Sequence, residues 1–177
     1  MFLGILFIFL ALLLYVFVSR KRSPVPYFPT NKKDIPLIIK ALNLRLNHTV
    51  VDLGAGNGIV IFKAANEAYK RGFDTKFYAV EINPILIAIL YIKRLFSKNR
   101  KNIFILFEDF TKMSLKKFAG AVFYLYLSPK YLNLVYKKIK NEAQNPKIVT
   151  YYYQIPGAVG VGENIVSIIG GKLEPSN

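Results

Sequence analysis

The chain contains no cysteine and only one histidine, His48, among its 177 residues. The lack of cysteine excludes disulfides, thiolate metal sites and a cysteine nucleophile. A single histidine excludes a cluster of histidine metal ligands and most Ser-His-Asp schemes. His48 precedes the first predicted strand in a polar loop, and we interpret it as a solvated loop residue rather than a catalytic one. No metal site is expected.

Acidic side chains are scarce as well. The chain has ten Asp and Glu residues against 25 Lys and Arg residues, which gives a formal net charge of +15. Such a charge suits nucleic acid, an anionic membrane surface or simple solubility. Half of the residues are hydrophobic, and the length suits one domain with a sizeable core.

The start of the chain favours the membrane among these three explanations. Met1 to Val18 carries no charge, and as a helix it would span about 27 Å, just short of a ~30 Å hydrocarbon core. A cleaved signal peptide would need a basic start and a small-residue cleavage site, and the sequence has neither. Residues 1–19 are therefore predicted to be a retained, single-pass transmembrane anchor. The basic residues 20–22 place the rest of the chain on the cytoplasmic side, next to anionic head groups.

Residues 20–33 are predicted to form a basic, proline-rich linker arm. Three prolines between Ser23 and Thr30 prevent a continuous helix, so the arm is expected to be extended and fairly stiff. Tyr27 and Phe28 within it either pack on the following domain as a lid over a site, or lie at the membrane interface as an aromatic pair. Both interpretations stay open.

Residues 34–177 are predicted to form one α/β domain. Strands are expected at 49–52, 76–80, 103–107, 119–127, 147–153 and 164–169, and helices at about 30–44, 59–71, 85–96 and 128–142. Strands that alternate with helices, each a nearly unbroken apolar run, indicate a mostly parallel sheet with helices on both faces. Only about one strand fits after Pro156, so a shortened C-terminal end is expected.

A glycine-rich turn joins the first predicted strand to the next helix. Between Thr49 and Gly58 the sequence is T-V-V-D-L-G-A-G-N-G. Gly54, Gly56 and Gly58 lack a Cβ where the chain needs unusual dihedral angles and a ligand must approach closely. The spacing D-x-G-x-G-x-G differs from the dinucleotide pattern G-x-G-x-x-G, and no Gly-Lys-Ser/Thr follows as in a P-loop.

Four of the ten acids follow directly on predicted strands: Asp52, Glu81, Glu108 and Asp109. The carboxyl ends of parallel strands are where ligands bind in an open α/β sheet. The alternative is that these acids only cap the helices that follow them. A carboxylate at Glu81 offers two acceptor oxygens to the hydroxyls of a ribose, and Asp109 is placed to receive the amino group of an adenine.

Together these residues resemble the class I S-adenosylmethionine-dependent methyltransferases. Val50–Gly58 is similar to their first motif, Glu81 matches the ribose-binding acid, and Glu108-Asp109-Phe110 resembles the adenine-side motif. The resemblance, over about residues 34–169, implies a Rossmann-like sheet and S-adenosylmethionine as the cofactor. It implies cofactor contacts from Asp52, Gly54, Ala55, Gly56, Asn57, Gly58, Glu81, Ile82, Asn83, Glu108, Asp109 and Phe110.

A narrower resemblance concerns the substrate. The apolar anchor, the Pro-Tyr-Phe-Pro-Thr arm, the glycine turn and Glu81-Ile-Asn-Pro are similar to small membrane-anchored protein-lysine methyltransferases. These are related to the mitochondrial enzymes that modify the ATP synthase c-subunit and the adenine nucleotide translocase. The resemblance implies a lysine of a membrane-embedded protein as the acceptor, with the arm and the loop after the fourth strand at its border. The candidate groups that would orient the acceptor are the backbone carbonyls near Ser128 and Pro129 and a tyrosine hydroxyl. That tyrosine is Tyr27, Tyr126 or Tyr152, and the choice among these groups stays open.

Other functions stay open beside this one. Enzymes that methylate amino groups of nucleic acids carry Asn/Asp-Pro-Pro-Tyr after the fourth strand, whereas this chain has Leu-Ser-Pro-Lys, so nucleic acid is not the expected partner. Methylation of a lipid or another small molecule at the membrane is one alternative. A methyltransferase-like scaffold without catalysis is the other.

Overall fold

The computed structural model describes residues 4, 6–7, 29–162 and 165–170. Among these residues, no helix combines the length and the apolar character that crossing a bilayer requires. Nearly all of the predicted anchor over residues 1–19, and the linker arm as far as residue 28, fall outside the described residues. The predicted domain from residue 34 onward falls almost entirely within them.

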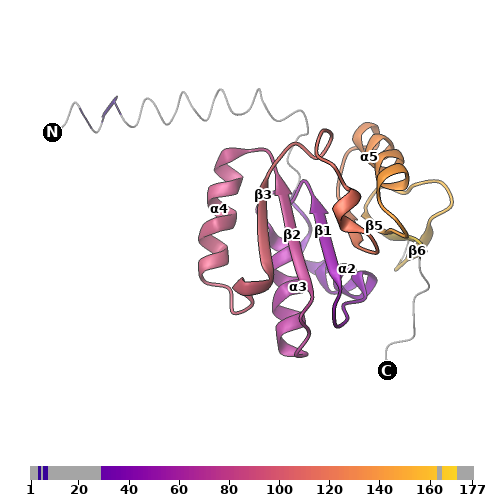
Figure 1. Ribbon diagram of the computed structural model, residues 1–177, viewed down its shortest axis with the longest axis horizontal. Coiled ribbons are helices and arrows are strands. Elements are labelled where there is room, and N and C mark those ends of the chain that lie inside the picture. The colour runs from indigo at the N-terminus through magenta and orange to yellow at the C-terminus, as the bar shows by residue number, and fades with distance from the viewer. Residues whose placement is uncertain (1–3, 5, 8–28, 163–164, 171–177) are drawn as a thin grey trace.

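A seven-stranded sheet forms the centre of the domain, in the order β3-β2-β1-β4-β5-β7-β6 (Figure 1). Five neighbouring strands are parallel: β1 (Thr49–Leu53), β2 (Lys76–Glu81), β3 (Ile103–Phe107), β4 (Val122–Leu125) and β5 (Lys147–Tyr151). β7 (Val166–Ile169) pairs antiparallel with β5, and β6 (Val159–Val161) pairs antiparallel with β7. The strand order reverses between β1 and β4, which is where open α/β sheets bind ligands.

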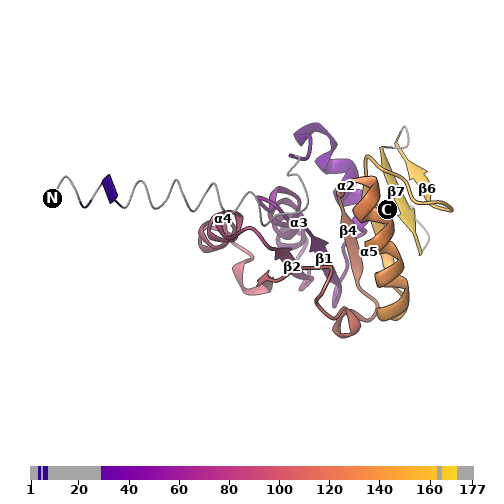
Figure 2. The same cartoon turned by 90° about the horizontal axis from the view of Figure 1, so that it is seen from above.

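Helices cover both faces of this sheet (Figure 2). α2 (Ile35–Leu42), α3 (Ile59–Lys70) and α4 (Pro84–Leu95) lie on one face, where Ile38, Ile61 and Leu90 enter one hydrophobic core. α5 (Pro129–Glu142) and the 3₁₀ turn η3 (Lys116–Phe118) contribute to a second core on the other face. Two further 3₁₀ turns, η1 (Lys32–Asp34) and η2 (Arg100–Asn102), precede α2 and β3.

The residues that predicted the start of α4 make the expected capping contacts in the structure. Asn83 begins α4, because its side-chain oxygen accepts from the backbone N–H of Ile85 at 2.9 Å and of Leu86 at 3.4 Å. Pro84 follows at the first helical position, where no backbone N–H is needed. The alternation of strands and helices and the parallel sheet are confirmed.

Three predictions need correction. The sheet has two strands after Pro156, whereas about one was expected. The additional strand β6, Val-Gly-Val, is short and largely exposed, so its sequence contains no apolar run from which it could be predicted. β4 is shorter than predicted, since Gly120 turns the chain with a φ of 68° before it begins. His48 is half-buried with its Nδ1 shielded from solvent, and burial together with the charges of Arg45 and Lys147 lowers its pKa.

Candidate functional site

The glycine turn forms a tight loop at the carboxyl end of β1. Gly54, Gly56 and Gly58 have φ values of 90°, 58° and 74°, a region that side chains other than glycine rarely adopt. The N–H groups of Gly54 and Ala55 both donate to the carbonyl of Val80 in β2, at 2.9 Å each. These bonds fix the loop against the neighbouring strand, so its backbone is held in place before any ligand arrives.

Asn57 and Gly58 connect this loop to α3. The side-chain oxygen of Asn57 accepts from the N–H of Ile59 at 3.1 Å, and the N–H of Gly58 donates to the carbonyl of Ala55 at 2.8 Å. A Cβ on Gly58 would lie 2.4 Å from Cδ2 of Leu90 and 2.8 Å from the Phe62 ring. The space at Gly58 is therefore filled by side chains of the protein itself, whereas the sequence suggested a ligand there.

Glu81 joins the end of β2 to the glycine loop. Its Oε2 accepts from the N–H of Gly56 at 2.8 Å, and its Oε1 accepts from the N–H groups of Ile82 and Asn83 at 2.8 Å each. The residue is only 6% exposed. A carboxylate has about four acceptor positions, so most of them are already used within the protein. Glu81 thus orders the loop first, and it retains limited acceptor capacity for a ribose.

Asp52 and Tyr124 form a buried polar pair beside the loop. They are register partners on β1 and β4, and they are 3% and 2% exposed. Burial and the charge of Glu81 raise the pKa of the Asp52 carboxyl well above its ordinary value. Burial and the charge of Asp52 likewise raise the pKa of Tyr124, against a smaller lowering by the side chain of Thr30.

The Tyr124 hydroxyl is shielded from solvent, and within the described ranges it makes no hydrogen bond of normal geometry, although the side chain of Thr30 lies close enough to lower its pKa. A buried hydroxyl without a well-formed hydrogen bond costs free energy, about 1–3 kcal/mol, and such groups in folded proteins generally have a partner. Together with the adjacent Asp52 carboxyl, it suits a ligand that brings a positively charged donor group. The ammonium end of an amino-acid moiety has that chemistry.

The predicted adenine-side residues follow β3 and lie near the loop. Phe110 is buried, and its ring is 3.6 Å from the place of a Cβ on Gly54. The Asp109 Oδ1 accepts from the N–H of Thr111 at 2.9 Å and from its hydroxyl at 2.6 Å. One oxygen of Asp109 therefore caps the following turn, which is the role that the capping alternative assigned to it. Glu108 donates its N–H to the carbonyl of Glu81 at 3.2 Å.

Tyrosines gather at the carboxyl ends of β4 and β5. We call Tyr126, Tyr151, Tyr152 and Tyr153 the tyrosine cluster. The rings of Tyr126 and Tyr151 meet edge to face with centroids 4.7 Å apart, and Tyr152 lies 6.3 Å from Tyr151 and 5.3 Å from Tyr153. Burial, then the neighbouring Tyr153 and Tyr152, raise the pKa of Tyr126. Tyr126 therefore stays protonated and keeps a hydroxyl that donates and accepts.

Tyr152 has an unusual backbone conformation. Its φ is 71°, and its side chain is 64% exposed. A bulky residue in this region is strained, and strain of this kind concentrates at functional sites, where it costs about 1–3 kcal/mol. The chain thus holds an aromatic ring out into solvent at the edge of the sheet where the glycine loop lies.

The junction between the linker arm and the domain, from Asn31 to Asp34, is bound to the tyrosine cluster. The Tyr151 hydroxyl donates to Oδ2 of Asp34 at 2.7 Å. Burial, then this bond and the charge of Asp34, raise the pKa of Tyr151 to about 12. The end of the arm therefore lies beside β5. Tyr27, the arm residue predicted to orient an acceptor, lies outside the described residues.

Ser128 and Pro129 start α5, with Pro129 at its first position. The Ser128 carbonyl accepts from the N–H of Leu132 at 2.9 Å, so the first turn of the helix already uses it. Ser128 occupies the cap position of α5, but its hydroxyl makes no capping hydrogen bond.

Sequence reasoning missed four residues of this region: Asp34, Tyr124, Tyr151 and Tyr153. The run Tyr151-Tyr152-Tyr153 at the end of a predicted strand was a visible signal for an aromatic edge. Tyr124 lies two residues before Tyr126, so strand alternation puts both on one face of the sheet. The pairing of Tyr124 with Asp52 and of Tyr151 with Asp34 follows from strand order, which the sequence does not show.

Comparisons of sequence find no matching family model and no curated protein with a significant match. Comparisons of structure find an RNA methyltransferase from Salinibacter ruber in complex with S-adenosyl-L-homocysteine. Its TM-score is 0.61 at 14% identity, over 80% of this chain and 90% of the other. The fold is that of the class I methyltransferases.

Two further methyltransferase structures agree. A precorrin-6y C5,15-methyltransferase from Geobacter metallireducens gives a TM-score of 0.57 at 18% identity, over 69% of this chain and 62% of the other. A glycopeptide N-methyltransferase in complex with sinefungin gives a TM-score of 0.53 at 14% identity, and the match covers 70% of this chain and 50% of the other. In this methyltransferase fold the glycine loop, Glu81 and the tyrosine cluster all follow parallel strands, so they share one edge of the sheet.

Proposed function

We propose that the chain is an S-adenosylmethionine-dependent methyltransferase that acts on an amine, specifically a lysine side chain of a membrane or membrane-associated protein. The arrangement at the carboxyl edge carries this proposal. Glu81 accepts a hydrogen bond from the preformed glycine loop, and Asp52 and Tyr124 lie buried as register partners on the strands β1 and β4. The tyrosine cluster completes the edge on the β4 and β5 side.

The residues present fit this cofactor. Asp52 and Tyr124 would hold its cationic amino-acid end, the free capacity of Glu81 would bind ribose, and Phe110 would contact the adenine side. The solved neighbours that hold S-adenosyl-L-homocysteine or sinefungin support the choice. When bound, S-adenosylmethionine supplies an electrophilic methyl group on a sulfonium. The positive charge of that group suits an edge to which four of only ten acids contribute.

The tyrosine cluster supports an amine as the acceptor. Faces of aromatic rings attract alkylammonium groups, and such rings are used to recognise lysine and its methylated forms. A lysine must lose a proton before it can attack, and partial burial beside a cation lowers its pKa. The Tyr126 hydroxyl, which stays protonated, would accept a hydrogen bond from the amine and orient its lone pair. Most of the rate would come from holding donor and acceptor in line.

Two measurements test the proposal on the full chain in a mild detergent. Calorimetry with S-adenosylmethionine is expected to show binding, and a lack of binding would support the scaffold alternative instead. Membranes from the cells that make the protein would then be incubated with labelled cofactor. Label in a protein band supports lysine methylation. Label in extracted lipid or in RNA contradicts it in favour of those acceptors.

A matched pair of variants tests the role of Tyr126. Tyr126→Phe is expected to lower the methylation rate about tenfold, the equivalent of one hydrogen bond of about 1.4 kcal/mol, without changing cofactor affinity. Tyr69→Phe, on the exposed side of α3, serves as the control and should change neither. Equal rates in the two variants would remove Tyr126 from the site.

A further inference from the structure

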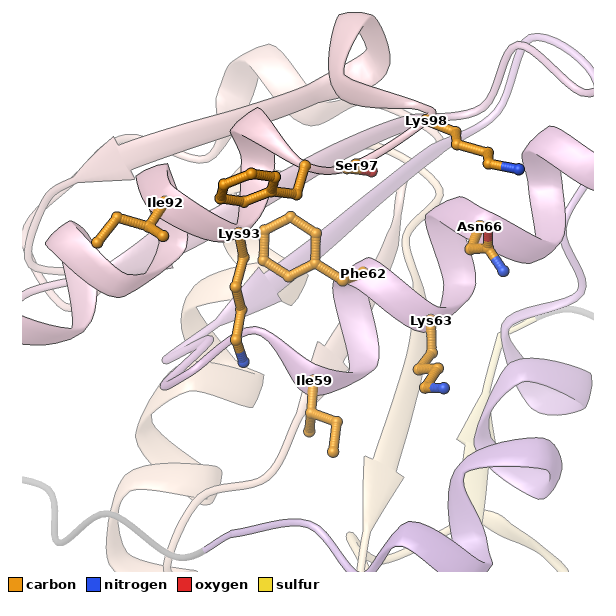
Figure 3. Close-up of a pocket in the computed structure, with 9 residues that line it drawn as sticks. Ile59, Phe62, Lys63, Asn66, Ile92, Lys93, Ser97 and Lys98 are labelled. Atoms are coloured by element: carbon orange, nitrogen blue, oxygen red, sulfur yellow. The ribbon is translucent and has the colours of Figure 1, made fainter.

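Side chains of α3 and α4 line an open groove of about 500 Å³ (Figure 3). Figure 3 shows the lining residues Ile59, Phe62 and Lys63 on α3, and Ile92 and Lys93 on α4. Lys98, after the end of α4, also lines the groove. The groove thus combines apolar side chains with three lysine ammonium groups.

α4 also exposes large apolar residues, of which Ile92 and Phe96 line the groove. Tyr91, Ile92, Leu95 and Phe96 are 50%, 56%, 65% and 84% exposed. They follow one another within a turn and a half of helix, and α4 lies at the outer side of the domain beside β3 (Figure 1). A contiguous exposed apolar patch of this kind marks an interaction surface.

The charge around this patch is of one sign. From Ile82 to Phe107 the sequence contains no acid, and its cations are Lys93, Arg94, Lys98, Arg100 and Lys101. An apolar stripe flanked by lysines and arginines is complementary to an anionic membrane surface, where apolar side chains enter the head-group boundary and cations meet phosphates.

We infer that this face of α3 and α4 docks on a bilayer that contains anionic phospholipid. The aliphatic side chains Ile92 and Leu95 favour lipid over a nucleic acid, because single-stranded nucleic acids bind by stacking of bases on aromatic rings. The inference does not depend on methyl transfer. It adds a contact of the folded domain to the predicted anchor at residues 1–19.

Docking would also place the glycine loop near the membrane. The Lys93 ammonium donates to the carbonyl of Asn57 in that loop at 2.7 Å. The groove and the carboxyl edge of the sheet are therefore neighbours. A protein substrate that projects a short distance from the bilayer would then lie near the site.

The absence of native cysteine allows single-site labels on the full chain. Leu95→Cys and, as the control, Asn133→Cys on the exposed side of α5 would carry an environment-sensitive fluorophore. Both proteins would be reconstituted into phosphatidylcholine vesicles, with and without phosphatidylglycerol at about 7:3, with nitroxide-bearing lipid as quencher. We expect quenching at Leu95→Cys at least about threefold stronger than at Asn133→Cys, and only in the anionic vesicles.

Charge reversal tests the lysines. Lys63→Glu combined with Lys98→Glu should reduce the quenching at position 95 at least about threefold, because both side chains line the groove. Lys137→Glu combined with Lys140→Glu, exposed on α5, is the matched control and should leave it unchanged.

Three results would overturn the inference. Equal quenching at the two labels would mean that the face does not enter the bilayer. A label at position 95 that is shielded in detergent and indifferent to lipid quenchers would show that protein covers the face. A response of that label to added RNA, but not to vesicles, would assign the face to nucleic acid.

Discussion

Gly58 provides a test of why the loop needs its glycines. A Cβ there would lie 2.4 Å from Cδ2 of Leu90, a side chain that is fully buried. Gly72, at the end of α3, has nearly the same φ, 70° against 74°, but nothing within 4 Å of its Cβ position. Alanine at either position has the same left-handed strain, about 1–2 kcal/mol. Only Gly58→Ala adds overpacking, about 1–3 kcal/mol.

The difference between the two variants therefore isolates the packing contribution. Thermal unfolding followed by near-ultraviolet circular dichroism, in one detergent for all proteins, should give a lower Tm for Gly58→Ala than for Gly72→Ala. For a domain of this size, each kcal/mol corresponds to about 2–4 °C. Equal Tm values in the two variants would refute the argument that Leu90 and Phe62 require a glycine at position 58.

Three further predictions concern the polar groups of the site. The pKa of Asp52 is raised in the folded state. Its contribution to stability is therefore present below about pH 4 and is lost as the pH rises through the raised pKa. The loss is about 1.4 kcal/mol for each unit by which the pKa is raised. Asp52→Asn should therefore gain Tm relative to the native chain between pH 4 and pH 8 while losing cofactor affinity; a Tm difference independent of pH would contradict this. Glu81→Gln turns an amide N–H toward the Gly56 N–H, which should cost about 2 kcal/mol of stability and at least about tenfold in cofactor affinity by calorimetry. Unchanged affinity would remove Glu81 from the site. Tyr151→Phe breaks the bond to Asp34, which should lower stability by about 1 kcal/mol and raise the KM for the acceptor but not for the cofactor; an equal rise in both would contradict a role on the acceptor side.

The fold could be predicted from local signals because each strand and helix is locally consistent. Each local pattern predicts a single type of structure, as shown by the apolar run of β1, the glycine turn and the Asn83-Pro84 start of α4. The strand β6 escaped prediction because three residues, one of them glycine, carry too little pattern. Short edge strands are formed by their partner rather than by their own sequence.

The candidate site was predictable in its residue types but not in its contacts. The position of Glu81 after a strand indicated a carboxylate at the ligand edge, yet its bond to the Gly56 N–H depends on how β1 and β2 pair. Asp109 shows the limit most clearly, because one of its oxygens serves Thr111. Both interpretations of that acid, ligand contact and cap, were consistent with the sequence, and only side-chain geometry separates them.

The chain has few acidic side chains, and no acid among the described residues lines the groove between α3 and α4. This separation explains how one protein could attract both a cationic cofactor and an anionic surface. Glu67 pairs with Arg71 and Glu142 with Lys138, so these acids are already neutralised where they lie. Asp52 and Glu81 instead lie buried at the carboxyl edge, where solvent screens their charge little. The lysines of the groove between α3 and α4 face solvent. Salt should therefore weaken attraction to a membrane at the groove far more than attraction of a sulfonium to the loop, because the first acts through water and the second through the protein interior.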